Sequence, residues 1–183
     1  FIFIVVLGIE SARQTVARLK KGRRVEELEQ FALNDSMTGM YNRNAYDYFV
    51  KNEKDFEGYV IVTFDLNNLK QCNDQYGHRA GDEYIINAAH IIEDNFERYG
   101  KCYRIGGGEF WCIIPKGRYF KIERVMHKID QDVEILNHKN IIPVPVGIAY
   151  GYAVFTADDT DPEKVRERAD EDMYRNKKAM KQS

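Results

Sequence analysis

The sequence is short of the residues that build metal clusters, disulfide scaffolds and nucleic-acid surfaces. It has only three cysteines in 183 residues, without a metal-type spacing. An odd count favours free thiols over a disulfide framework. Lys and Arg number 27 against 29 Asp and Glu, a net charge of −2, so no global basic surface argues for nucleic acid. The sequence also contains no internal repeat and no low-complexity segment.

No hydrophobic run is long enough to span a bilayer. The apolar run Phe1–Ile9 falls short of the about 20 residues that a membrane helix needs. Basic residues follow it from Arg13 to Arg24, which is typical of the cytoplasmic end of a transmembrane helix. We therefore expect residues 1–9 to be the end of such a helix, with a buried helix start as the alternative. Residues 10–33 predict a linker helix, either solvated or paired in a short coiled coil.

The rest of the chain alternates between apolar strands and amphipathic helices, which predicts an α/β domain over residues 34–183. The strand predictions are Tyr59–Asp65, which is apolar on both faces and therefore central, and one or two strands in Ile142–Phe155. The helix predictions are Asn44–Asn52, Asp82–Tyr99, Arg118–Asn137 and a last helix with Pro162 at its first position.

Tyr103–Trp111 predicts a strand, a glycine turn and a second strand. Apolar residues flank three consecutive glycines, and glycine reaches a positive φ without a Cβ clash. A plain hairpin needs fewer glycines, so the run indicates that a ligand approaches the backbone closely. Glu109 follows the glycines, where its carboxylate faces either a metal and ligand or only solvent.

A second polar stretch follows the central strand. Asp65 ends this strand, where an acid serves either as a helix cap or as a ligand for a metal. Spaced polar residues and glycines continue from Asp65 to Asp82. This stretch resembles the second signature of the GGDEF family, the diguanylate cyclase domains, which runs Asp-x-(Asp/Asn)-x-(Phe/Leu)-Lys-x-x-Asn-Asp-x-x-Gly-His-x-x-Gly-Asp.

The glycine hairpin resembles the first signature of the same family, Arg-x-Gly-Gly-(Asp/Glu)-Glu-Phe. The matching residues are Arg104, Gly106, Gly107, Glu109 and Phe110. Gly108 departs from the signature, because it stands where the family carries its first acid. Asp35–Arg43 and Ala169–Lys177 resemble two further family motifs, so the resemblance covers residues 34–181.

The resemblance implies a central, mainly antiparallel sheet with a βαββαβ core and flanking helices. It also implies a homodimer in which each domain holds one GTP. The 3′-hydroxyl of each nucleotide attacks the α-phosphate of the other, giving cyclic di-GMP and pyrophosphate, with Mg²⁺ (or Mn²⁺) as cofactor. The implied setting is bacterial signal transduction at the cytoplasmic face of the inner membrane, with no nucleic-acid partner.

Resemblance also assigns the site residues one by one. The metal ligands are Asp65, the carbonyl of Leu66, and Glu109. The guanine contacts are Asn73 and Asp82. The residues near the phosphates are Leu69, Lys70, Lys177 and Lys181. Gly106 and Gly107 belong to the hairpin that the nucleotide approaches. His78 is expected to be a structural turn residue.

Two departures from the family pattern decide the functional hypothesis. Gly108 can neither bind a metal nor assist deprotonation of the attacking hydroxyl, as the family's acid does at this position. Glu97–Gly100 also lacks both ends of the Arg-x-x-Asp motif that binds the product in many members. The sequence therefore favours a degenerate domain that binds GTP and cyclises it poorly. An active cyclase and a structural dimerisation or docking module are the alternatives.

Overall fold

The structure is a computed structural model that describes residues 32–117 and 121–180. The predicted membrane segment 1–9 and the linker helix up to residue 31 lie outside these residues, as does Lys181. Within the described ranges, no helix is both long and apolar enough to cross a membrane. The membrane and linker predictions therefore stay predictions.

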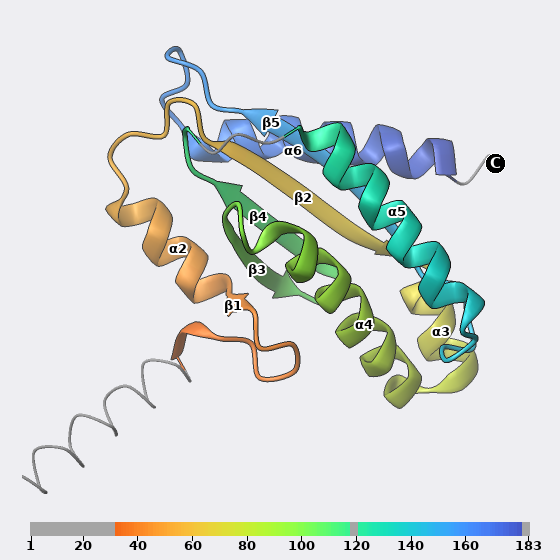
Figure 1. Cartoon of the computed structure of the whole chain (residues 1–183). Helices are drawn as coiled ribbons and strands as arrows, with labels where there is room; N and C mark the ends of the chain where they lie inside the picture. The colour runs from red at the N-terminus through yellow and green to blue at the C-terminus, as the bar shows by residue number, and fades with distance from the viewer. Residues whose placement is uncertain (1–31, 118–120, 181–183) are drawn as a thin grey trace, which may run out of the picture.

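The core of the domain is a five-stranded sheet in the order β1-β3-β4-β2-β5 (Figure 1). Its strands are β1 (Tyr41–Asn42), β2 (Val60–Asn67), β3 (Lys101–Gly106), β4 (Glu109–Ile114) and β5 (Gly147–Val154). Only the short β1–β3 pair is parallel, and the other pairs are antiparallel. The predicted, mainly antiparallel sheet is confirmed, and β2 is flanked on both sides as its two apolar faces indicated.

Helices cover both faces of the sheet. They are α2 (Arg43–Asn52), α3 (Leu69–Tyr76), α4 (His78–Phe96), α5 (Ile122–His138) and α6 (Pro162–Met180). In Figure 1, α4 and α5 lie in front of the sheet and α6 lies behind it, and α2 packs in the same apolar cluster as α6. Side chains of β2 alternate between the two layers: Val62 and Phe64 pack in the cluster with α4 and α5, and Ile61 packs in the cluster with α2 and α6.

Some element bounds differ from the sequence predictions, for identifiable reasons. Helix α3 was not predicted, because its eight residues are mostly polar and carry little periodicity. Gly77 separates α3 from α4 at φ 83°, a left-handed value that glycine adopts easily. His78 is the first residue of α4, so the turn role expected for it was wrong. Only Gly107 and Gly108 form the hairpin turn, since Gly106 still belongs to β3.

Candidate active site

The two acids expected near a metal lie opposite each other across the β2–β4 pair. Asp65 is the register partner of Glu109, and directly paired residues project from the same face of a sheet. The glycine turn between β3 and β4 is bonded to the same end of β2, because the Leu66 N–H donates to the Gly108 carbonyl at 3.0 Å. The register therefore brings Asp65, the Leu66 backbone and Glu109 to one edge of the sheet.

Helix α6 adds a cation to this edge. The Lys177 ammonium donates to Asp65 Oδ2 at 2.7 Å, although the two residues are 112 positions apart. Both side chains are largely covered, with 23% and 27% of their surface exposed. The helix lies close enough to make this contact because it packs against Gly151 of β5, where a Cβ would overlap the helix backbone. Lys177 thus lies beside Asp65, and its role toward a phosphate stays a prediction.

The donor set at this edge suits a hard divalent cation whose shell is completed by substrate. Mg²⁺ commonly uses one or two carboxylates together with phosphate oxygens and water. Asp65, Glu109 and the Leu66 carbonyl supply oxygen donors of that kind. Asn67 lies two residues beyond Asp65 on the same strand face, and its buried Oδ1 has no hydrogen-bond partner among the described residues. Over 32–117 and 121–180, no cluster of three His, Cys, Asp or Glu forms a complete metal site.

The predicted guanine contacts come together where α3 meets α4. Asn73 lies on α3 and Asp82 lies in α4, five residues after Gly77 separates the two helices. Asn73 fits there because Gly81 has no side chain: a Cβ on Gly81 would overlap Asn73 Oδ1. Asp82 is exposed and Asn73 is half-buried, so both present polar atoms to a ligand. A carboxylate and an amide at this position can pair with the polar edge of a base.

The three glycines of the hairpin occupy different environments. A Cβ at Gly106 or Gly107 would meet no atom within 4 Å, so the backbone is open to a ligand there. Gly107 also has φ +51°, a conformation that most side chains avoid. A Cβ at Gly108 would instead lie 3.0 Å from Leu66 Cβ and 3.0 Å from Leu69 Cδ2. Leu69 therefore packs against the very position where the family's acid would project.

Arg104 holds the hairpin turn against the first motif of the domain. Its guanidinium donates to the Gly107 carbonyl at 3.1 and 3.3 Å and to Asp35 Oδ1 at 2.9 Å. Burial raises the pKa of Asp35, but hydrogen bonds from Arg104 and Thr38 outweigh it and leave the pKa below its ordinary value. Sequence reasoning matched Arg104 and Asp35 to separate motifs and missed that they bind each other.

Tyr84 is a second residue that the sequence did not single out. Its hydroxyl donates to the Asn67 carbonyl at 2.5 Å and accepts from the Gly147 N–H at 2.7 Å. Burial raises the pKa of Tyr84 to about 12, so the phenol stays protonated and can donate. These bonds fix α4 to the end of β2 and the start of β5. Of the other predicted phosphate residues, Lys70 is exposed on α3 and Lys181 lies outside the described residues.

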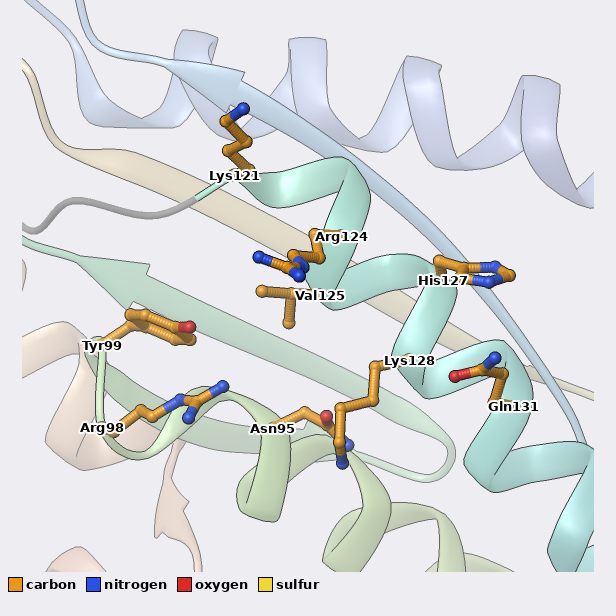
Figure 2. Close-up of a pocket in the computed structure, with 9 residues that line it drawn as sticks. All are labelled: Asn95, Arg98, Tyr99, Lys121, Arg124, Val125, His127, Lys128 and Gln131. Atoms are coloured by element: carbon orange, nitrogen blue, oxygen red, sulfur yellow. The ribbon is translucent and has the colours of Figure 1, made fainter.

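Glu97–Gly100, which stands where many family members carry the product-binding motif, differs from the family pattern in structure as well as in sequence. A Cβ at Gly100 would overlap the Ile113 carbonyl, so an aspartate cannot stand there with this backbone. A basic cavity of about 450 Å³ lies nearby, between the end of α4 and α5 (Figure 2). Arg98 and Tyr99 line one side of it, and the α5 side chains line the other. This cavity is on the α4–α5 side of the sheet, whereas Asp65 contacts α6.

The family match agrees with this geometry. The model of the diguanylate cyclase GGDEF domain matches residues 32–183, nearly the whole chain. The chain therefore belongs to the GGDEF domain family and is a diguanylate cyclase-like domain of cyclic di-GMP signalling.

Individual relatives point to the same family. The bifunctional diguanylate cyclase/cyclic di-GMP phosphodiesterase MucR of Pseudomonas aeruginosa is 31% identical over 147 residues, which cover 75% of this chain and 22% of MucR. The diguanylate cyclase DgcS of Shewanella oneidensis is 28% identical over 158 residues, which cover 83% of this chain and 52% of DgcS. The chain thus spans about half of DgcS or less than a quarter of MucR.

The solved coiled coil and GGDEF domain of DgcB from Caulobacter crescentus, in complex with c-di-GMP, has the same fold. It superposes with a TM-score of 0.77 at 23% identity, covering 94% of this chain and 95% of that chain. The predicted α/β architecture is therefore confirmed by comparison as well as by the strand order.

Proposed function

We propose that this domain binds GTP together with a divalent metal but forms cyclic di-GMP weakly or not at all. The observation that carries the proposal is the contrast at the hairpin. Gly108 offers no carboxylate, and Leu66 and Leu69 pack where that side chain would begin. The residues proposed to hold the nucleotide are nevertheless present, at the α3–α4 junction and on α6.

Three separate features of the chain support nucleotide binding. Asp82 has the acceptor oxygens that guanine N1–H and its amino group require, and Asn73 presents an amide from the facing helix. Gly106 and Gly107 leave open backbone for the close approach of the ligand. Lys177 lies at the same edge, paired with Asp65. A cation bound by Asp65 would compete with the ammonium, which then becomes available to a phosphate.

The metal-binding residues in this proposal are Asp65, Glu109 and the Leu66 carbonyl. When bound, Mg²⁺ would supply positive charge to the phosphate oxygens. The chain itself orients the nucleotide through Asn73 and Asp82 and balances phosphate charge through Lys177. It lacks a group at position 108 to take the proton from the attacking hydroxyl. Losing such a group typically costs a large part of the rate but little of the ground-state binding.

A working cyclase is the second candidate, and one observation favours it. Glu109 faces Asp65 directly in the β2–β4 register, so two carboxylates already share one edge. If Glu109 also receives the proton, the missing acid at position 108 matters little. The second candidate requires one side chain to perform two roles, which is why we place it below the receptor.

The experiment is a calorimetric titration of Mg–GTP into the purified chain, with cyclic di-GMP quantified from the same cell. ATP serves as the control nucleotide, because it lacks the donors that Asp82 accepts. Protein concentration is held where sedimentation shows a dimer, since the reaction needs two domains. Guanine-selective binding without product supports the receptor. Product at ordinary enzyme rates supports the cyclase, and no binding of either nucleotide leaves a docking module.

A further inference from the structure

Two of the three cysteines form a close pair inside the hairpin. Cys102 on β3 is the register partner of Cys112 on β4, so their side chains project from the same face. The Cys112 thiol donates to Cys102 Sγ, with the two sulfur atoms 2.8 Å apart. A disulfide bond is about 2.05 Å long, so the two sulfur atoms already lie close to bonding distance.

One of the two cysteines lies at the wall of a cavity. Cys102 lines a cavity of about 230 Å³ together with Lys101, Gly100 and Tyr41. Glu93 and Glu97 also line it, so the mouth carries charges of both signs. Cys102 is 4% exposed and Cys112 is fully buried. A small oxidant in this cavity therefore lies nearer to Cys102 than to the fully buried Cys112.

We propose that Cys102 and Cys112 are a redox modification site that is converted by hydrogen peroxide to a cross-strand disulfide. The Cys102 thiol loses its proton and its sulfur attacks one peroxide oxygen, which breaks the O–O bond. Cys102 becomes a sulfenic acid and the displaced oxygen leaves as water. The Cys112 sulfur then attacks Cys102 Sγ, the S–O bond breaks, and the Cys112 proton leaves with the hydroxide as a second water. Two thiols are oxidised and one peroxide is reduced.

The two cysteines differ in the way that these two reaction steps require. Burial raises the pKa of Cys112 well above its ordinary value, so it remains a protonated thiol that donates to Cys102. Cys102 also lines the cavity, whereas Cys112 is fully buried, so Cys102 is the sulfur that is oxidised first and Cys112 resolves it. The resulting bond would tie β3 to β4 a few residues before the glycine turn. It would restrain the hairpin that carries Glu109, independently of whether the domain cyclises GTP.

Cys72 provides an internal control. It is fully buried on α3 and packs in the same core as the pair, but it is a separate free thiol. A protein-wide loss of structure under peroxide would expose and oxidise all three cysteines. Site-selective chemistry would leave Cys72 reduced. The comparison thus separates a built site from general oxidative damage.

The test is mass spectrometry of the purified full chain after treatment with hydrogen peroxide, followed by denaturation and alkylation. We expect a loss of two hydrogen atoms, about 2 Da, and one peptide pair joined through Cys102 and Cys112. Cys72 should be alkylated, and dithiothreitol should restore all three thiols. Full alkylation of every cysteine after peroxide would overturn the proposal, and so would a sulfinic acid on Cys102 without a cross-link.

Two variants guard against a misleading result. Cys72→Ala should still form the cross-link, while Cys102→Ala should form none. The melting temperature of the oxidised Cys72→Ala protein should rise and return to its starting value with dithiothreitol, because a cross-link restricts the unfolded chain. A cross-link that joins Cys72 to either partner would contradict the assignment of the pair.

Discussion

The two ends of the candidate site, the α3–α4 junction and the glycine hairpin, are built differently, although strand β2 lies next to both. At the α3–α4 junction, a missing side chain makes room for a functional one, because Gly81 leaves space for Asn73. At the hairpin, a missing side chain removes a functional group, because Gly108 replaces an acid and Leu69 packs against it. Under the proposed function, Gly81 makes room in the guanine-binding surface and Gly108 leaves the catalytic surface without its acid.

Under the proposed function, this difference means that turnover is lost while nucleotide binding is kept. The residues proposed to contact the nucleotide lie on helices α3, α4 and α6, which pack against the sheet or against one another. Position 108, where the acid is missing, lies in a two-residue turn. Arg104 already holds the backbone of this turn, so the fold does not require a side chain at position 108. A substitution in that turn therefore changes the chemistry while the sheet and helices remain in place.

The largest effect should come from restoring the acid with Gly108→Glu. We expect the rate of cyclic di-GMP formation to rise by about a thousandfold, because a charged group is regained where the reacting hydroxyl is activated. Leu69 must yield by a few tenths of an ångström, at a cost in stability of about 1 kcal/mol. Gly108→Ala is the matched control, because it crowds Leu69 equally and adds no carboxylate. An equal gain from alanine would contradict the account.

Gly81→Ala should weaken binding at the proposed guanine contacts. The new Cβ displaces the Asn73 amide, so the affinity for Mg–GTP should fall by roughly 10- to 100-fold as its hydrogen bonds are lost. Thermal stability should change little, because the preference of a helix for alanine over glycine, about 1 kcal/mol, offsets the crowding of Asn73. Arg79→Ala, two residues earlier and exposed, is the control for calorimetry. Unchanged affinity in Gly81→Ala would remove Asn73 from the site.

Lys177→Met should have a smaller effect, confined to the phosphates. We expect an affinity for GTP about tenfold weaker, with binding of guanosine unaffected, because one ammonium is lost near the triphosphate. Lys178→Met is the control, since the Lys178 ammonium lies over the Tyr174 ring, 4.4 Å from its centroid. Calorimetry with both ligands separates the outcomes, and an equal loss for guanosine would point to a structural role of Lys177.

The smallest effect concerns the anchor of the hairpin. Asp35→Asn should lower the free energy of unfolding by about 1 kcal/mol near neutral pH, because the bond to Arg104 loses its charge. The pKa of Asp35 is lowered in the folded state, so its contribution is present above the ordinary value and disappears as pH falls through the folded value. Urea unfolding at decreasing pH should show the two proteins converging.

Asp94→Asn, exposed on α4, is the control for that pH series. A constant gap between Asp35→Asn and the unmodified protein down to about pH 3 would contradict the charge-based explanation.

Much of the fold followed from the sequence because the signals were strong. β2 is apolar on both faces and is central, and Pro162 does begin α6. Helix α3 was missed because a short polar helix has no apolar stripe to reveal it. Motif positions placed Asp65, Asn73 and Asp82, but no pattern in the chain shows which side chain fills the space beside Gly108. That depends on the packing of Leu69, which only the assembled structure contains.

Contacts between distant segments could also not be predicted from the sequence. The Arg104–Asp35 and Lys177–Asp65 pairs join residues 69 and 112 positions apart, and neither pair has a local signature. Cys102 and Cys112 flank the hairpin in the sequence, which places them near each other, and the strand register makes them direct partners.

The most direct test compares affinity with turnover in the unmodified protein and in Gly108→Glu, at saturating Mg–GTP. The dissociation constant is measured by calorimetry and the initial rate of cyclic di-GMP formation by quantifying product in the same samples. The account predicts similar dissociation constants and rates that differ by about a thousandfold. Equal rates in the two proteins would contradict it and assign the chemistry to Glu109.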